Sequence, residues 1–379
     1  MTDDAATDTP PPRQWTRDYD ALRGQLDVWL KSQLPAEAEP RVSALIVPES
    51  NGMSSDTVLF DLSLVEDGEP AVKPCVARLA PEDTATPVFP SYDLPKQFRV
   101  IRLVAERTPV PVPPALWLEP DDAAVGSPFF VMERVEGQVP PDVLPYTFGD
   151  NWLADASAAD QRRLQDSTVR TLAAVHQIDV ENADLSYLEF GHEGDTALRR
   201  HVNEIWSYYE WVAQQGVRQP LIERCFAWMD EHWPDDDGTP VLLWGDARVG
   251  NVLYRDFEPV GVLDWEMAAV GPREIDLGWM MFLHRFFQDI SDQMELPGLP
   301  DFMRRDDVVA TYEQASGATV RDPHFYMMYA ALRHGIIMSR IQQRLVATGD
   351  GIMPDDPDDM IMHRSTLEAM LDGTYWAKL

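Results

Sequence analysis

Hydrophobic and polar residues alternate at several places before residue 136, which predicts strands in this part of the chain. Residues 57–65 alternate most regularly, as expected for a strand with one buried face. Asp67-Gly68 follows and is a turn signal for a hairpin, so residues 72–79 are predicted as the returning strand. Other elements are predicted at 42–47, 115–118 and 129–135 as strands and at 94–107 as a helix.

After Gly137, apolar residues recur three and four positions apart, which predicts long helices. Helices are expected at 158–178, 196–214, 220–233, 275–287 and most of 306–371, with another at 15–34. Short strands are expected at 241–244, 252–254 and 260–263. The predicted fold class is α+β, with a small lobe of five antiparallel strands and one helix, and a larger, mostly helical lobe. The lobes are predicted at residues 14–135 and 136–379, after a disordered tail at 1–13.

Composition and charge limit the partners that can be expected. The chain has 379 residues, with 31 lysines and arginines against 64 aspartates and glutamates, so the formal net charge is −33. A nucleic-acid partner is not expected, because a phosphate backbone binds a basic surface. The acidity either keeps the protein soluble or favours cationic ligands, and the composition leaves both interpretations open.

The cysteines and the apolar segments bear on the cellular compartment. Cys75 and Cys225 stand in apolar surroundings and are interpreted as buried free thiols of a reducing compartment. The acidic, proline-rich start of the chain does not resemble a signal peptide. No run of 18 apolar residues occurs, so a membrane span is not expected. A cytoplasmic protein is therefore predicted.

One segment combines the residue types that phosphoryl transfer needs. The apolar strand at 241–244 leads into a loop with Asp246 and, five residues later, Asn251, and a second strand leads into Asp264. Transfer to a hydroxyl requires a carboxylate that orients the hydroxyl and accepts its proton. It also requires oxygen ligands for Mg²⁺, which prefers carboxylate and amide oxygens. These three residues are therefore a candidate catalytic set.

Both motifs resemble those of the aminoglycoside phosphotransferase (APH) family, whose catalytic loop has His-Gly-Asp, four residues and Asn, followed later by Ile-Asp-Trp-Glu. The corresponding residues here are Trp244-Gly245-Asp246 with Asn251, and Leu263-Asp264-Trp265-Glu266. Asp276-Leu277-Gly278 follows where the family has a similar turn into a helix. Trp244 replaces a histidine that mostly supports loop geometry. The chain looks closest to actinobacterial phosphotransferases and to the kinase-like domain fused to some acyl-CoA dehydrogenases.

The resemblance extends from about residue 40 to the end of the chain. It implies a bilobal, protein-kinase-like fold and transfer of the γ-phosphate of ATP to an alcohol group of a small molecule, with Mg²⁺ as the metal. Asp246 corresponds to the catalytic base, and Asn251 and Asp264 correspond to the Mg²⁺ ligands. Arg248 is expected to contact phosphate or substrate.

The first lobe resembles the nucleotide side of the family. Gly52 and Ser54 lie in a loop that resembles the phosphate-covering loop, although an ordinary hairpin loop explains it equally well. Arg78 occupies the place of the strand lysine that contacts ATP phosphates, and the alternative is a solvent-exposed arginine at a sheet edge. Gln97 replaces the glutamate that pairs with this basic residue, and a neutral amide binds it more weakly.

Residues 130–137 resemble the hinge of the family. The resemblance places Met132 behind the adenine pocket and assigns binding of the adenine edge to backbone groups of Glu133 and Val135. His176 lies on an apolar helix and is expected to be a hydrogen-bonded core histidine. The aromatic residues at 206–211 are either core or one wall of an acceptor pocket.

Several functions stay open at this stage. Aminoglycosides carry ammonium groups that suit an acidic lobe, but family members also phosphorylate choline-like compounds, sugars, amino alcohols and hydroxyacyl-CoA thioesters. The acidity disfavours the anionic CoA group unless a local basic patch receives it, such as Arg162, Arg163, Arg199 and Arg200. A nucleotide-binding pseudokinase is the main rival, favoured by Gln97 and the single loop glycine. A hydrolase is disfavoured because no Gly-x-Ser-x-Gly motif occurs.

Overall fold

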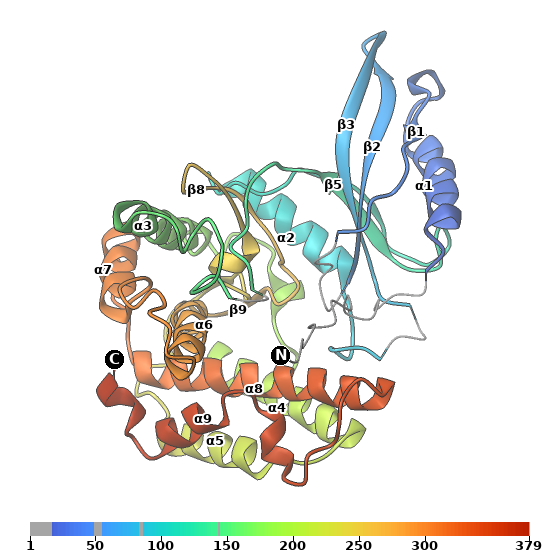
Figure 1. Ribbon diagram of the computed structural model, residues 1–379. Coiled ribbons are helices and arrows are strands. Elements are labelled where there is room, and N and C mark those ends of the chain that lie inside the picture. The colour runs from blue at the N-terminus through green and yellow to red at the C-terminus, as the bar shows by residue number, and fades with distance from the viewer. Residues whose placement is uncertain (1–16, 49–54, 83–85, 143–144, 379) are drawn as a thin grey trace, which may run out of the picture. The chain divides into compact units, whose positions relative to one another are not determined.

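The computed structural model describes residues 17–48, 55–82, 86–142 and 145–378 (Figure 1). By its internal contacts the chain divides into two compact units. The first unit comprises Met1–Pro87 and Trp117–Val131, and the second comprises Val88–Leu116 and Met132–Leu379. Helix α2 (Leu94–Arg107) has the bounds expected from the sequence and belongs to the second unit. Among the described residues, no helix is long and apolar enough to span a membrane.

A five-stranded antiparallel sheet is the main feature of the first unit, with the strand order β1-β2-β3-β5-β4. Its strands are β1 (Arg41–Val42), β2 (Asp56–Glu66), β3 (Glu69–Leu79), β4 (Ala115–Glu119) and β5 (Phe129–Glu133). In the β2–β3 hairpin, Asp67 and Gly68 have φ values of 54° and 83°, which a two-residue hairpin turn requires. The predicted hairpin and the α+β fold class are confirmed.

The alternation in β2 places one row of side chains in the core of the first unit. Val58, Phe60 and Leu62 are all buried, as the period of two predicts. Helix α1 (Tyr19–Gln33) is capped at its N-terminus by Asp18, whose carboxylate accepts hydrogen bonds from the backbone N–H groups of Asp20 and Ala21. Each large apolar side chain buried here contributes roughly 1.5–3 kcal/mol to the free energy of unfolding.

The second unit is mostly helical. Besides α2, its helices are α3 (Ala158–Val175), α4 (Ala197–Gln215), α5 (Pro220–Glu231), α6 (Glu274–Gln293), α7 (Arg305–Ser316), α8 (Pro323–Thr348) and α9 (Arg364–Leu371). Strand β6 (Pro240–Leu243) pairs with β9 (Ala269–Pro272), and β7 (Val252–Arg255) pairs with β8 (Glu258–Val262). The hydrophobic pattern did not predict β9, because Ala-Val-Gly-Pro lacks alternation.

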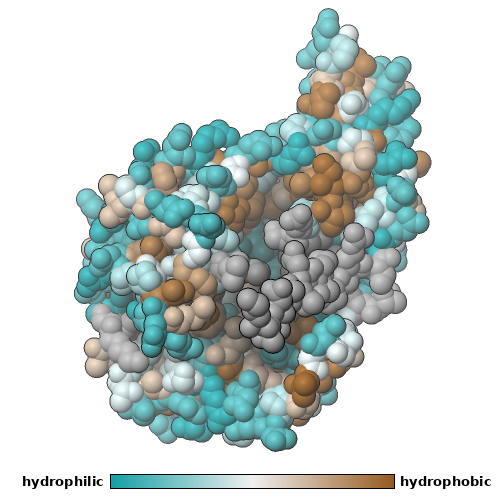
Figure 2. All heavy atoms as spheres, in the orientation of Figure 1, coloured by the Kyte–Doolittle hydropathy of each residue, from teal (hydrophilic) through white to brown (hydrophobic). Residues whose placement is uncertain are grey.

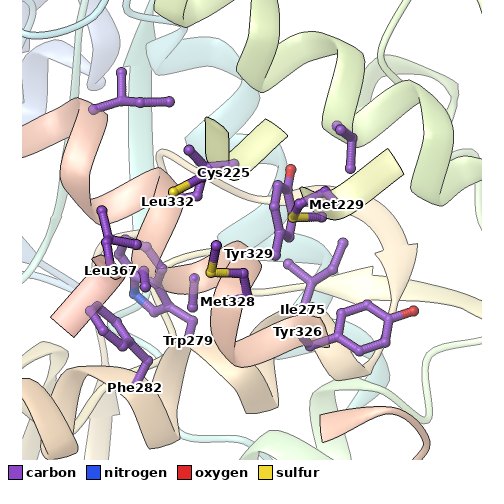
Figure 3. Packing of buried hydrophobic residues seen from close by; sticks show 14 of the residues in the cluster. Cys225, Met229, Ile275, Trp279, Phe282, Tyr326, Met328, Tyr329, Leu332 and Leu367 are labelled. Atoms are coloured by element: carbon purple, nitrogen blue, oxygen red, sulfur yellow. The ribbon is translucent and has the colours of Figure 1, made fainter. Parts of the chain in front are cut away.

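The core of the second unit forms where α8 packs against α4, α5, α6 and α9 (Figure 3). Gly278 of α6 allows close contact with α8, since a Cβ there would lie 2.5 Å from the carbonyl oxygen of Tyr326. Cys225 belongs to this core and Cys75 is buried in the first unit, so both cysteines are buried as expected. On the face shown in Figure 2, hydrophilic residues predominate at the surface of both units.

Two buried histidines of the second unit should make the fold sensitive to acid. Burial lowers the pKa of His284 to about 3 and that of His363 to about 4. Between these values and about 6.5, the unfolded chain binds protons that the folded protein does not. The free energy of unfolding should therefore fall as pH drops from about 6.5 to 4, by about 1.4 kcal/mol per pH unit for each histidine.

Urea unfolding between neutral pH and the acid range measures this slope. His363→Gln removes the titrating group but keeps a donor for the carbonyl oxygen of Ala331, to which His363 Nε2 lies at 2.9 Å. The variant should lose stability less steeply with falling pH. An unchanged slope would mean that His363 does not contribute.

Candidate active site

The loop after β6 turns sharply at Gly245, and the carboxylate of Asp276 accepts hydrogen bonds from its backbone. Gly245 has a φ of 91°, and a Cβ there would lie 2.1 Å from the carbonyl oxygen of Met267, so only glycine fits. The backbone N–H groups of Trp244 and Gly245 donate to the two oxygens of Asp276 at 2.7 and 2.9 Å. Asp276 lies in the first turn of α6 and is fully buried. The loop conformation is therefore fixed by α6.

A buried histidine completes the support of this carboxylate. His176 Nε2 lies 3.1 Å from Asp276 Oδ2, and His176 Nδ1 lies 2.7 Å from the Tyr312 hydroxyl on α7. All three side chains are buried or nearly so. The expectation of a hydrogen-bonded core histidine is confirmed, and the structure adds that His176 orients the residue that holds the loop.

The carboxylate of Asp246 is held by three side-chain donors. Trp279 Nε1 donates to Oδ1 at 2.6 Å, Asn251 Nδ2 donates to Oδ2 at 2.6 Å, and Arg248 Nε lies within 3.2 Å of both oxygens. The Asp246 side chain is 14% exposed, so it is fixed but still reachable from solvent. Trp279 lies one turn after Asp276 on α6. The motif did not point to Trp279; its three-residue spacing from Asp276 is the signal that could have done so.

Arg248 joins two carboxylates. Its Nε binds Asp246 and its Nη1 binds Asp142, a residue for which no role was predicted from the sequence. Burial opposes the charge of Arg248, but the carboxylates of Asp246 and Asp142 outweigh it and raise its pKa. Gly250 makes room for this pair, because a Cβ there would lie 2.5 Å from both Arg248 Nη1 and Asp142 Oδ1. Contact of Arg248 with phosphate or substrate stays a prediction.

The β7–β8 hairpin places the two expected metal ligands at the same end. Val252 pairs with Val262, and the Leu263 N–H donates to the Asn251 carbonyl at 2.9 Å, so Asn251 and Asp264 flank the end of the hairpin. Asp264 has a φ of 59°, a left-handed conformation that carries strain and often occurs at functional sites. Trp244, in place of the family histidine, donates from Nε1 to the Leu263 carbonyl at 2.7 Å and ties this end to the loop.

The donor set at this end suits Mg²⁺. The Asn251 amide nitrogen is committed to Asp246, so its amide oxygen is the atom that can face a cation. That oxygen and the Asp264 carboxylate are hard ligands of the kind that Mg²⁺ prefers, and phosphate oxygens usually complete its shell. Among the described residues, no group of three or more His, Cys, Asp and Glu side chains could hold a metal without such help.

Residues 130–137, which are expected to form the hinge, include most of β5 and end beside the β7–β8 hairpin. Met132 is buried, and the Glu133 N–H donates to the Pro114 carbonyl at 2.9 Å. Binding of the adenine edge by backbone groups of Glu133 and Val135 stays a prediction. Gln138 and Tyr254 exchange two backbone hydrogen bonds of 2.8 Å. A Cβ at Gly261 of β8 would lie 3.5 Å from Val135, so β8 packs closely against this residue.

The remaining nucleotide residues belong to different parts of the chain. Gly52 and Ser54 lie outside the described residues. Arg78 is half-buried in the first unit and donates from Nε and Nη2 to the Ser55 hydroxyl at 3.1 and 2.6 Å. Gln97 is buried on α2 in the second unit. The hydrogen bond expected between Gln97 and Arg78 stays a prediction.

The aromatic residues and the arginines that were considered for substrate binding differ in their environments. Tyr209 is fully buried in the core and packs against Phe226 of α5, whereas Trp206 also contacts Phe226 but is 38% exposed. Tyr208 is buried and donates to the Val88 carbonyl at 2.9 Å. Every arginine of the patch considered for an anionic group is ion-paired: Arg162 with Asp166 and Asp307, Arg163 with Glu258, Arg199 with Asp230, and Arg200 with Glu189. That patch therefore offers little uncompensated charge.

Comparisons with known proteins agree with this geometry. The chain is 26% identical over 264 residues to "Probable acyl-CoA dehydrogenase IBR3" of Arabidopsis thaliana, which covers 66% of this chain and 31% of that protein. A solved structure from Ralstonia eutropha, assigned to the aminoglycoside phosphotransferases, superposes with a TM-score of 0.63 at 22% identity and covers 93% of this chain and 98% of that one. Aminoglycoside phosphotransferase APH(4)-Ia in complex with AMP-PNP and hygromycin B gives a TM-score of 0.55 at 15% identity, over 92% and 98%.

These likenesses differ in what they cover. The chain spans less than a third of the length of the curated acyl-CoA dehydrogenase relatives it matches, and the solved structures match almost end to end. The sequence profile of APH, described as the phosphotransferase enzyme family, matches residues 57–325, which include the catalytic loop and the end of the β7–β8 hairpin. The chain therefore belongs to the APH phosphotransferase enzyme family.

Proposed function

We propose that this protein is an ATP- and Mg²⁺-dependent phosphotransferase that acts on a hydroxyl group of a small molecule. The observation that carries the proposal is the fixed carboxylate of Asp246 beside Asn251, at the end of the hairpin that also carries Asp264. A base and two oxygen ligands are the side-chain inventory of phosphoryl transfer. The family membership supports the same reaction class.

Asp246 acts on the acceptor in this proposal. Its carboxylate orients the acceptor hydroxyl and accepts its proton while the acceptor oxygen bonds to the γ-phosphorus and the bond from that phosphorus to the ADP oxygen breaks. Trp279 and Asn251 hold the carboxylate in one orientation, which lowers the entropy cost of positioning the hydroxyl. Arg248 pairs with the carboxylates of Asp246 and Asp142 and offsets part of their negative charge.

Asn251 and Asp264 hold Mg²⁺ in this proposal. When bound, Mg²⁺ neutralises negative charge on the phosphate groups. Asn251 is shared, because its nitrogen donates to Asp246 while its oxygen faces the metal, so the base and the metal site are fixed by one side chain. A pseudokinase would not need this connection, and the presence of all three residues favours catalysis over nucleotide binding alone.

Mg²⁺ and ATP together should stabilise the protein, while Mg²⁺ alone should not. Two protein ligands leave the shell to be completed by phosphate oxygens. At about 100 times the dissociation constant, ATP·Mg²⁺ should add about 2.7 kcal/mol to the free energy of unfolding. Asp264→Asn should weaken ATP affinity in the presence of Mg²⁺ and have little effect without it. Calorimetry and thermal unfolding measure both quantities.

A matched control is available on the same hairpin. Asp256 is an exposed aspartate at the β7–β8 turn with a φ of 51°, a conformation that asparagine also tolerates. Asp256→Asn should bind ATP·Mg²⁺ as the native protein does. The absence of any shift in melting temperature with nucleotide, with or without Mg²⁺, would contradict the proposed function.

A further inference from the structure

Three arginines lie on one face of α8. Arg333, Arg340 and Arg344 are seven and eleven residues apart, close to two and three helical turns, so their side chains leave the helix in one direction. Burial lowers the pKa of each of them. A row of partly buried positive charges is unexpected in a chain with a net charge of −33.

Arg333 is the most deeply buried of the three. It is 2% exposed, and its Nε and Nη1 atoms are buried without a hydrogen-bond partner among the described residues. A buried cation that lacks an anion or acceptors costs several kcal/mol. Its guanidinium lies 4.7 Å from the ring centroid of Trp279 and 5.7 Å from that of Tyr329, so aromatic faces offset part of this cost. The remaining cost would be relieved by an arriving anion.

Trp279 connects this arginine to the candidate base. Its ring face contacts Arg333, while its Nε1 donates to Asp246 at 2.6 Å. The charges of Asp276 and Asp246 act on Arg333 without hydrogen-bonding to it. Arg333 and Asp246 therefore lie on two sides of one indole, that of Trp279.

The other two arginines, Arg340 and Arg344, follow Arg333 along α8. The Arg340 guanidinium lies 4.7 Å from the ring centroid of Trp211, whose ring stacks on Tyr208 at 6.0 Å. Arg344 and Glu266 both act electrostatically on the Tyr92 hydroxyl. Glu266 follows the Asp264-Trp265 motif, so this part of the α8 face lies near the segment with the expected metal ligand.

We propose that Arg333 binds a carboxylate or phosphate group of the acceptor, whose hydroxyl is then presented to Asp246. The acceptor class is therefore an anionic hydroxy compound, and not a polycationic aminoglycoside. This inference rests on the proposed phosphotransferase function. The positive charge is local, which is why the net charge of the whole chain does not predict it.

Binding of paired probes in the presence of Mg²⁺ and AMP-PNP tests the proposal. The carboxylate probe is a hydroxybutyrate, and its uncharged amide is the control. The phosphate probe is glycerol phosphate, and glycerol is the control. At least one anion should raise the melting temperature, and its uncharged partner should not. Which anion is bound distinguishes a carboxylate from a phosphate group. If neither anion binds, or if kanamycin binds and the anions do not, the proposal is overturned.

Variants at Arg333 separate ligand binding from structural support. Arg333→Met should weaken binding of the favoured anion about 100-fold and leave AMP-PNP affinity unchanged, while Arg333→Lys should recover part of the loss. In turnover, the change should appear in KM for the anionic acceptor more than in kcat. If Arg333→Met folds, binds AMP-PNP and keeps anion affinity, Arg333 does not bind the acceptor. If Arg333→Met does not fold, the Arg333→Lys variant tests the proposal instead. If Arg333→Lys binds the anion and its uncharged amide with the same affinities as the native protein, the proposal is overturned.

Failure of this inference differs from failure of the proposed function. A protein that binds AMP-PNP with Mg²⁺ but binds neither anion overturns the assignment of Arg333 alone. A protein that binds no nucleotide overturns the proposed function as well.

Discussion

Asp246→Asn is expected to lower turnover by about 10²–10⁴-fold while ATP·Mg²⁺ binding survives. Asparagine has nearly the same shape and keeps an oxygen for the Trp279 indole, which donates to Asp246 Oδ1 at 2.6 Å. It cannot accept the proton of an acceptor hydroxyl. Its amide nitrogen would also face the Asn251 amide nitrogen, now 2.6 Å from Asp246 Oδ2, so the hydrogen bond between these side chains is lost or reorganised.

Turnover and calorimetric ATP·Mg²⁺ affinity should be measured on the same preparation. Asp246→Asn should differ from Asp264→Asn, which should lose both quantities because it removes a charged metal ligand. Asp256→Asn serves as the control for removal of a carboxylate from the same hairpin. Turnover of Asp246→Asn at the native rate would show that another group is the base.

Asp276→Asn is expected to lower the free energy of unfolding by roughly 3 kcal/mol, because one buried N–H group loses its charged acceptor and the other keeps only a neutral one. The two Asp276 oxygens accept from the backbone N–H groups of Trp244 and Gly245 at 2.7 and 2.9 Å. An asparagine has only one side-chain oxygen, so one of these buried N–H groups would face an amide N–H₂ group. Turnover should fall as well, because the loop that carries Asp246 begins at these two residues.

Urea unfolding of the native protein and the variant measures the loss. Asp184→Asn is a suitable control, because the Asp184 side chain is 77% exposed and its pairing with Arg99 is a surface contact of 3.9 Å. Surface changes of this kind usually alter stability by less than about 0.5 kcal/mol. A loss as small as that in Asp276→Asn would show that the carboxylate is not the main support of the loop.

The catalytic set was accessible from the sequence because its members are close along the chain. Asp246 and Asn251 are five residues apart in one loop, and Asp264 ends the hairpin that follows. Residues that are this close along the chain can be recognised as a motif in the sequence alone. The side chains that hold the set were not accessible, since Trp279 is 33 residues and Asp142 is more than 100 residues from their partners.

By itself, the sequence determined the fold class, most of the helices and strands, and the family resemblance, because periodicity and turn residues are local properties. Only the tertiary structure decided which charges are compensated. The clustered Arg162, Arg163, Arg199 and Arg200 are all paired. Arg333, on an apolar helix, is buried against Trp279, and two of its nitrogens have no hydrogen-bond partner in the part of the chain that the structure describes. The physical reason is that the electrostatic environment of a side chain depends on its neighbours in space, which long-range packing brings together.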